Sequence, residues 1–457
     1  MGVVEELERI FHPRGIAIVG ASNRLGNMGN FYLQGFLQQG LDKDKIYVVH
    51  PVEKEVCGVK AYPRVGDIPG EVDLAFVFSP REAVPGIVMD CTHRGITGVV
   101  VFTAGFGEHS SEGERLQQEM VDIARSGATR IIGPNCLGIY CPSSHLVNYA
   151  GVMPGESGPV GMISQSGSLT VMFPIAASGM GIHFSKVISC GNECDLNAAD
   201  FLEYFDHDDE TQIVAAYIEG VKDGRRFFDV AKDMSKRKPI IVWKGGTSPV
   251  GSRSVASHTG VLAGTPQVWD VVYKQTGIIS VDSEDMMLDC LQAFYFLPLP
   301  QGKRVAIISG AGGTGVTIAD ACIEYGLEVA ELTEVTKRRL REIIPAVGTC
   351  IDNPVDLGMM SAFDPELIVE TVGTLARDEH VDMIIKTVGT NQPDYIRREV
   401  EAMVGIGKPV VYNTGVAMSV TMEVPKPMTG VAIYSSGRRA AYVLSKMFQY
   451  QRYRAAK

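Results

Sequence analysis

The sequence lacks the features that mark membrane, secreted and nucleic-acid-binding proteins. It has no run of about twenty apolar residues, the length that a membrane-spanning helix requires. Residues 1–6 include two glutamates and no long apolar core, so a secretory signal is not expected. Basic residues number 42 against 53 acidic ones, a net charge of −11, and such a chain does not present the basic face that nucleic acids require. We therefore expect a cytoplasmic protein that binds neither membrane nor nucleic acid.

Paired cysteines are also lacking. The chain has nine cysteines, an odd number, scattered over 457 residues. The closest group is Cys190 and Cys194, and no second pair follows at the spacing of a zinc site. This pattern predicts reduced thiols and no metal site.

Glycine, in contrast, is abundant. Its 50 residues tend to follow short apolar runs rich in Val and Ile. Such runs, alternating with segments of helix length, predict parallel strands in βα units and therefore an α/β fold. We divide the chain into three such series, residues 1–145, 146–300 and 301–457. The polar stretch 141–159 is predicted to be a linker, and 297–302 marks the second boundary.

The first series has a nucleotide-binding pattern, but its glycine turn departs from the dinucleotide fingerprint. After Gly20 the next glycine should be residue 22, which is Ser22. The second strand should end in an acid that binds the ribose diol, yet it ends in His50-Pro51, with Lys54 close behind. This chemistry favours a phosphorylated ribose. Coenzyme A, with its 3′-phosphate and pyrophosphate, fits it, and NADP stays possible.

Three glycine-rich turns precede predicted helices, at Gly20, at Ser166-Gly167 and at 310–315. A helix N-terminus presents unpaired N–H groups and a partial positive charge, and glycine lets an anion approach the backbone closely. Ordinary tight packing of helix on strand explains any one such turn equally well. The three together predict anion-binding helix ends.

Residues 245–264 form the most informative segment, rich in Gly, Ser and Thr and predicted to be a long structureless loop. This loop carries His258, and a neutral imidazole can attack a phosphoryl group and carry it as phosphohistidine. Glu219 directly follows a predicted strand, at the end where such folds keep their sites, and can fix the imidazole tautomer. The alternative is an exposed histidine without a role, which is the interpretation for the other eight histidines.

Four motifs make the chain resemble the nucleoside-diphosphate-forming acyl-CoA synthetases, and more narrowly the α subunits of ADP-forming acetate–CoA ligases, relatives of succinyl-CoA synthetase. The motifs are Ser257-His258-Thr259-Gly260, Tyr217-Ile218-Glu219-Gly220, Ser164-Gln165-Ser166-Gly167 and Gly133-Pro134-Asn135-Cys136. The resemblance covers essentially the whole chain. It implies a Rossmann-like CoA-binding domain followed by two flavodoxin-like ligase domains.

The resemblance also implies roles for residues. His258 would be the phosphorylated nucleophile and Glu219 its orienting carboxylate. The expected CoA-binding residues are Gly20, Ala21, Ser22, Gly26, Gly29, Val49, Pro51, Lys54, Ser79, Pro80, Thr103 and Ala104. The expected phosphate- and acyl-binding residues are Asn135, Ser164, Gln165, Ser166, Gly167, Gly310, Ala311, Gly312 and Gly313.

The implied reaction converts acyl-CoA, ADP and phosphate reversibly to acid, CoA and ATP, with acetyl-CoA the expected thioester. The sequence leaves no length for an ATP-grasp domain. The resemblance therefore implies a separate ATP-grasp β subunit that holds ADP or ATP and most of the Mg²⁺, in an α2β2 assembly. Two alternatives stay open, an NADP-dependent oxidoreductase and a non-catalytic CoA-binding protein. The chain does not reveal the preferred acid.

Overall fold

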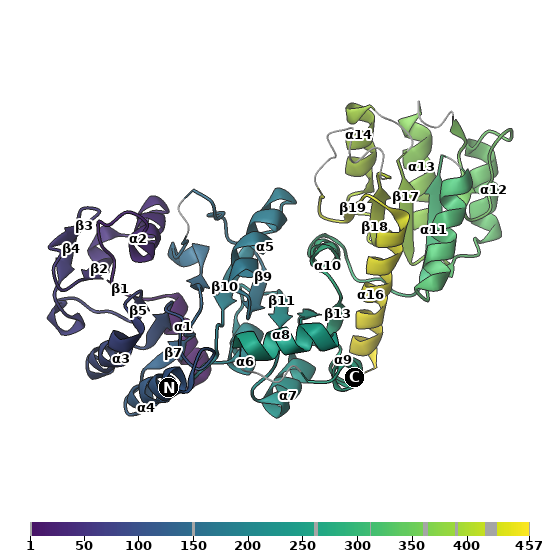
Figure 1. Ribbon diagram of the computed structural model, residues 1–457. Coiled ribbons are helices and arrows are strands. Elements are labelled where there is room, and N and C mark those ends of the chain that lie inside the picture. The colour runs from purple at the N-terminus through teal and green to yellow at the C-terminus, as the bar shows by residue number, and fades with distance from the viewer. Residues whose placement is uncertain are drawn as a thin grey trace. The chain divides into compact units, whose positions relative to one another are not determined.

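Three sheets of mainly parallel strands, each flanked by helices, build the chain in the computed structural model (Figure 1). The structure describes residues 2–148, 151–259, 264–310, 312–359, 364–388, 392–415 and 427–456, and only the backbone of residues 256–259. Two compact units, Met1–Asp282 and Ser283–Lys457, contain two sheets and one sheet respectively. No helix in the described ranges is long and apolar enough to cross a bilayer.

The first sheet is doubly wound, with the strand order β3-β4-β2-β1-β5-β6-β7, and is parallel except for the β3–β4 pair. β1 reads Ile-Ala-Ile-Val and is buried along its whole length, as expected for a parallel strand covered on both faces. The order reverses between β1 and β5, and ligands bind beyond the carboxyl ends of strands at such a switch point. The elements are α1 (Val3–Phe11), β1 (Ile16–Val19), α2 (Met28–Gln38), η1 (Lys43–Lys45), β2 (Ile46–Val49), β3 (Glu55–Val56), β4 (Val59–Tyr62), η2 (Val65–Asp67), β5 (Leu74–Val77), η3 (Arg81–Ala83), α3 (Val84–His93), β6 (Gly98–Val101), α4 (Ser111–Arg125) and β7 (Arg130–Ile132).

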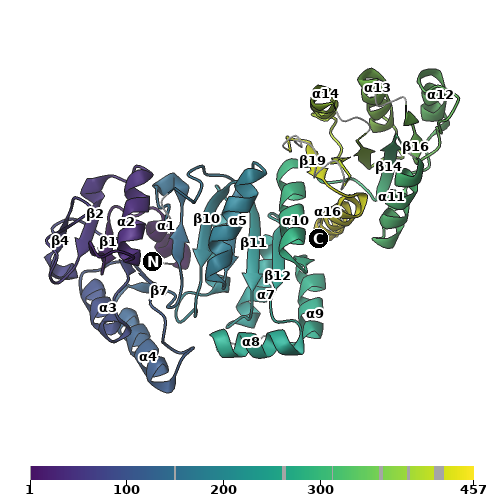
Figure 2. The ribbon, with the colours of Figure 1, turned by 45° about the horizontal axis from the view of Figure 1, so that its top comes forward.

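The second sheet has the order β13-β12-β11-β9-β10-β8, with β8 antiparallel to β10. Its parallel strands follow the flavodoxin-like order, with a switch point between β9 and β11. Helix α5 packs on β9 and β10 (Figure 2). The elements are β8 (Gly138–Tyr140), η4 (Pro142–Ser144), β9 (Val160–Ser164), α5 (Gly167–Gly179), β10 (Phe184–Ser189), α6 (Ala198–His207), β11 (Ile213–Ile218), α7 (Gly224–Met234), β12 (Ile240–Lys244), α8 (Pro249–Thr259), α9 (Pro266–Thr276) and β13 (Ile279–Val281).

The two sheets of the first unit share one hydrophobic core. Phe76 of β5 and Ile188 of β10 belong to the same cluster of buried side chains. Phe11 of α1 stacks on Tyr204 of α6 with 5.0 Å between the ring centroids. Because this core is continuous, the carboxyl ends of the two sheets are held in a fixed relation.

The second unit repeats the strand order of the second sheet. Its sheet runs β15-β14-β17-β18-β19, and β16 also pairs with β14. Helix α10 packs on β19 and α16. The elements are α10 (Glu284–Phe296), β14 (Arg304–Ser309), α11 (Gly312–Glu324), β15 (Glu328–Val329), α12 (Glu334–Ile343), β16 (Val355–Asp356), α13 (Pro365–Ala376), β17 (Met383–Thr387), α14 (Pro393–Met403), β18 (Val410–Asn413), β19 (Val431–Tyr434) and α16 (Gly437–Ala455).

The structure confirms the predicted α/β class and the flavodoxin-like order. It differs from the prediction at residues 249–259, which form helix α8 and not a structureless loop. Tertiary packing explains this helix: Val255 is buried, and a Cβ added at Gly246 would lie 2.8 Å from its Cγ2 atom. Two elements also cross the expected domain boundaries, since β8 joins the second sheet and α10 belongs to the second unit.

Candidate active site

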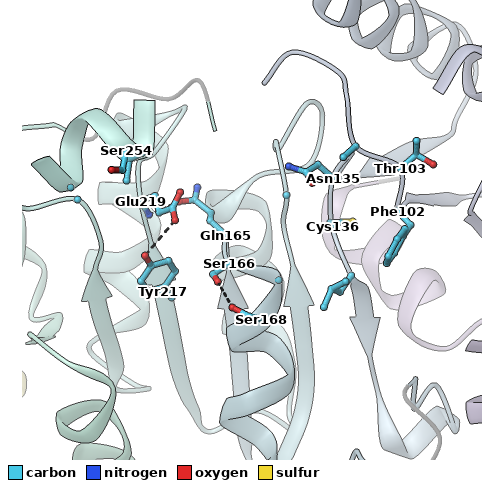
Figure 3. Close-up of a pocket in the computed structure, with 17 residues that line it drawn as sticks. Phe102, Thr103, Asn135, Cys136, Gln165, Ser166, Ser168, Tyr217, Glu219 and Ser254 are labelled. Carbon is cyan, nitrogen blue, oxygen red and sulfur yellow. Dashed lines mark hydrogen bonds between the residues drawn. The ribbon is translucent and has the colours of Figure 1, made fainter. Parts of the chain in front are cut away.

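A cavity of about 670 Å³ opens between the carboxyl ends of the two sheets in the first unit (Figure 3). The first sheet contributes the residues after β6 and the turn between β7 and β8. The second contributes the residues after β9 and β11, with helix α8 closing one side. The lining residues are Phe102, Thr103, Ala104, Asn135, Cys136, Leu137, Gln165, Ser166, Gly167, Ser168, Gly191, Tyr217, Glu219, Gly246, Gly251, Ser254 and Val255.

The turn after β1 packs tightly against the end of β5. Gly20 has a φ of +91°, and an added Cβ would lie 3.1 Å from the Oγ atom of Ser79. Thr103, at the end of β6, donates from its hydroxyl to the backbone oxygen of Ser79 at 2.6 Å. The predicted CoA-binding residues after β1, β5 and β6 therefore lie along one edge of the first sheet.

Asn27 shapes the start of helix α2 within this edge. Its Oδ1 accepts from the backbone N–H of Asn30 at 2.8 Å and from that of Ser22 at 3.2 Å. Its Nδ2 donates to the backbone oxygen of Gly20 at 3.0 Å. A Cβ added at Gly29 would lie 2.9 Å from the backbone of Ala21, so the helix approaches the turn closely. This compact turn can place its backbone against a phosphate group.

Asn135 joins the two sheets. It follows a cis Gly133–Pro134 peptide and has a φ of +58°. Its backbone N–H donates to the backbone oxygen of Thr103 at 3.1 Å. Its Nδ2 donates to Oδ1 of Asn192 at 3.5 Å, across to the loop that follows β10. Figure 3 shows Asn135 and Thr103 together at one end of the cavity.

Helix α5 begins at the cavity. Ser166 is its N-cap residue, and its side chain makes no capping hydrogen bond. The Ser164 hydroxyl stabilises this turn. It accepts from the backbone N–H of Ser166 at 3.1 Å and donates to the backbone oxygen of Ser166 at 2.8 Å. Gly167 opens the helix without a side chain. The first turn can therefore direct N–H groups and the positive end of its dipole at an anion in the cavity.

Gln165 fixes the position of Glu219 at the opposite end of the cavity. Its Oε1 accepts from the backbone N–H groups of Glu219 at 2.5 Å and Gly220 at 3.0 Å, and its Nε2 donates to the backbone oxygen of Gly220 at 2.8 Å. The Tyr217 hydroxyl donates to Oε1 of Glu219 at 3.3 Å (Figure 3). Glu219 is only 9% exposed. The carboxylate is thus held at the wall in a defined orientation.

Lys244, which the sequence analysis did not select, lies under this carboxylate. It is 7% exposed, and its ammonium group donates to the backbone oxygen of Glu219 at 2.8 Å. Burial lowers the pKa of Lys244 to about 8. Lys244 is the last residue of a buried strand and lies at the edge of the sheet that carries the other site residues. This position was the signal in the sequence that could have identified it as a site residue.

The 190–194 loop contains a second unpredicted ionisable group, Glu193. This side chain is 2% exposed, and its Oε1 accepts from the backbone N–H of Ala198 at 3.1 Å. Burial raises the pKa of Glu193 to about 7. The neighbouring thiols stay neutral, because burial raises the pKa of Cys136 to about 12 and that of Cys190 well above its usual value. A buried thiol in its neutral form is a poor nucleophile.

The cavity brings together seven of the predicted site residues: Thr103, Ala104, Asn135, Gln165, Ser166, Gly167 and Glu219. The others in the first unit lie outside the lining: Gly20, Ala21, Ser22, Gly26, Gly29, Val49, Pro51, Lys54, Ser79, Pro80 and Ser164. In the second unit, Gly310 follows β14, and Gly312 and Gly313 open α11. Ala311 and the side chain of His258 lie outside the described residues, while the backbone at position 258 lies one turn beyond Ser254 in α8.

Three family models match the chain in succession. They are a CoA-binding domain over residues 14–142, a succinyl-CoA-ligase-like flavodoxin domain over 157–294 and a CoA-ligase domain over 305–424. Each match covers most of one sheet of the structure. The chain is thus built from a CoA-binding domain and two domains similar to those of CoA ligases, and the first two meet at the cavity.

Similarity to individual proteins narrows this class. The α subunit of the ADP-forming acetate–CoA ligase II of Pyrococcus furiosus is 43% identical over 83% of this chain and 81% of its own length. The ADP-forming acetate–CoA ligase I of Archaeoglobus fulgidus is 34% identical over 98% of this chain, which spans 64% of that protein. The chain belongs to the family of ADP-forming acetate–CoA ligases.

A solved structure agrees with this assignment. The dinucleotide-forming acetyl-coenzyme A synthetase 1 of Ca. Korarchaeum cryptofilum, in complex with phosphate and ADP, has a TM-score of 0.88 and 31% identity to this chain. The match covers 98% of this chain and 97% of that one.

Proposed function

We propose that this chain is the CoA-binding, phosphohistidine-bearing subunit of an ADP-forming acid–CoA ligase, with acetyl-CoA as the expected thioester. One observation carries the proposal: a single cavity joins the CoA-binding edge, through Thr103 and Asn135, to the N-terminus of α5 and to Glu219. Such a site can hold a thioester, a phosphate and an orienting carboxylate at the same time.

The reaction would proceed in three balanced steps. A phosphate oxygen attacks the thioester carbonyl, the C–S bond breaks, and the CoA thiolate leaves and takes a proton. The His258 imidazole then attacks the phosphorus of the acyl phosphate, and the carboxylate leaves. Finally, an oxygen of the ADP β-phosphate attacks the phosphohistidine, and breaking the N–P bond gives ATP and free imidazole.

The residues at the site suit these steps. The N-terminus of α5 places N–H groups where negative charge accumulates on the phosphoryl oxygens. Glu219 can accept from one imidazole nitrogen of His258 and leave the other free to attack. Gly310, Ala311, Gly312 and Gly313 are proposed to supply a second phosphate-binding helix start. Gly20, Ala21, Ser22, Gly26, Gly29, Val49, Pro51, Lys54, Ser79 and Pro80 are proposed to bind CoA.

A partner subunit completes the proposal. This chain spans 49% of the ADP-forming acetate–CoA ligase of Methanocaldococcus jannaschii and 64% of the Archaeoglobus fulgidus enzyme I, so these relatives extend well beyond it. Two relatives from Pyrococcus furiosus are named as α subunits, and on this ground we infer a separate ATP-grasp β subunit in an α2β2 assembly. It would hold ADP or ATP and most of the Mg²⁺.

Labelling with ATP tests the proposed function. The chain, co-purified with its partner and incubated with γ-labelled ATP, should acquire acid-labile phosphate. His258→Ala should abolish this label, and Glu219→Gln should slow its formation by about tenfold or more because the imidazole loses its orienting carboxylate. Full labelling of His258→Ala would contradict the assignment. Tight binding of NADP(H) without binding of CoA would instead favour the oxidoreductase alternative.

A further inference from the structure

The loop that follows β6 is held by a carboxylate outside the cavity. Oε1 of Glu108 accepts from the backbone N–H of Gly105 at 2.5 Å, and its Oε2 accepts from that of Phe106 at 3.1 Å. The same loop contains Thr103 and Ala104, which line the cavity, whereas Glu108 does not. Glu108 therefore holds the loop that forms the predicted CoA-binding side of the cavity, although it does not itself line the cavity.

The other partner of this carboxylate comes from the second sheet. Asn192, 3% exposed in the loop after β10, donates from Nδ2 to Oε2 of Glu108 at 2.5 Å and to Oε1 of Gln117 at 3.1 Å. Its backbone N–H donates to the backbone oxygen of Pro134 at 2.9 Å, and its Oδ1 accepts from Nδ2 of Asn135 at 3.5 Å. One side chain thus connects the loop after β6, helix α4 and the Asn135 turn.

Among the described residues, the donors to Glu108 are the N–H groups of Gly105, Phe106 and Asn192, an arrangement that favours an ionised carboxylate. Burial disfavours ionisation, but the hydrogen bonds from Asn192 and from the backbone of Gly105 and Phe106 outweigh it, and the pKa of Glu108 lies below its ordinary value. A neutral amide at this position would always direct an NH2 group at another donor.

We propose that Glu108 and Asn192 form a clamp between the two sheets that positions the 103–106 loop against the Asn135 turn and so sets the affinity for CoA and its thioesters. This inference rests on the proposed function and assigns both side chains as positioning residues. Within the part of the chain that the structure describes, neither Gln165 nor Glu219, at the phosphoryl-transfer end of the cavity, hydrogen-bonds to Glu108 or Asn192. Loss of the clamp should therefore weaken CoA binding and leave the phosphorylation of His258 by ATP nearly unchanged.

The experiment is a double-mutant cycle with Glu108→Gln, Asn192→Asp and the double variant. Asn192→Asp places two carboxylates in contact, and Glu108→Gln places two NH2 groups in contact. The double variant restores a donor–acceptor pair with the roles exchanged. Glu119→Gln is the control, since this exposed glutamate pairs with Arg115 of the same helix, α4, at 3.0 Å.

Three readouts separate the possible results. They are the affinity of the full chain for CoA by calorimetry, the KM for acyl-CoA in the complex with the partner, and the rate of labelling by γ-labelled ATP. Each single variant should weaken CoA binding and raise KM by about tenfold. The double variant should recover most of this loss, and the labelling rate should stay within about twofold throughout.

Unchanged CoA affinity in both single variants would overturn the clamp, as would a double variant that is no better than the worse single one. Equal loss of labelling and of CoA binding in the single variants would also overturn it, because that result indicates general damage to the fold. A wild-type chain that binds CoA but takes no label would contradict the proposed function instead, and the calorimetric comparison would still decide the clamp.

Discussion

At the residue scale, the cavity depends on ionisable groups that are buried and individually paired. Glu219 is held by Gln165 and Tyr217, and Lys244 donates to the backbone under it. Glu219 and Asn135 could be predicted from the sequence because each lies in a short motif that follows a strand. Glu108 and Asn192 could not be predicted in this way. They are 84 positions apart in the sequence, and what links them is the contact between their side chains in the folded chain.

Glu193 gives a prediction for the pH dependence of stability. Its folded-state pKa of about 7 lies above the ordinary value of 4.5, so between these values the folded chain holds a proton that the unfolded chain has lost. Stability therefore falls as pH rises through this window. Glu193→Gln removes the effect, and above about pH 7 the variant should be more stable than wild type by up to about 3 kcal/mol.

Urea unfolding at about pH 5 and about pH 8 measures this difference. The gain of Glu193→Gln over wild type should be small at the lower pH and large at the higher one. Glu119→Gln, at an exposed position, should show no such change. An equal gain at both pH values would show that the carboxyl of Glu193 ionises normally in the folded chain.

At the element scale, the site depends on a close contact between two turns, Gly133–Cys136 and the 190–194 loop. Gly191 has a φ of +56°, and an added Cβ would overlap the backbone oxygen of Pro134. Helix α8 shows that amino-acid composition alone does not predict the secondary structure of this segment. Its Gly- and Ser-rich sequence favours a loop, but burial of Val255 against Gly246 stabilises a helix.

Gly191→Ala tests the contact between these turns. The substitution combines an unfavourable φ with steric overlap, so we expect a loss of at least about 2 kcal/mol in the free energy of unfolding of the first unit. Gly179→Ala is the matched control, because a Cβ there meets nothing within 4 Å at the end of α5. It should be neutral or stabilise by up to about 1 kcal/mol. Similar unfolding energies for the two variants would rule out the tight contact.

At the scale of the whole molecule, the first two sheets form one unit through a shared core, although the sequence suggests three separate series. Burial of Phe76 and Ile188 in the same cluster and the stacking of Phe11 on Tyr204 tie residues of the first sheet to the second. A cut at the predicted boundary of 145 would expose this core to water. A cut after residue 282 follows the division between the compact units.

Fragments of the chain test this organisation. The fragment 1–282 should fold and bind CoA within about threefold of the affinity of the full chain, because it contains every proposed CoA-binding residue. The fragment 1–145 should be poorly folded, with a weak or absent cooperative transition in thermal unfolding monitored by circular dichroism. A stable, CoA-binding fragment 1–145 would show that the shared core contributes little.

The sequence by itself determined the α/β class, the buried strands and the short motifs that end at the carboxyl edge of each sheet. These features are local, since they depend on hydrophobic periodicity and on residues a few positions apart. Only the tertiary structure decided which strand ends meet at one cavity, that residues 249–259 are helical, and that Asn192 reaches Glu108. Those outcomes depend on packing and hydrogen bonds between residues far apart in the chain, which no local pattern encodes.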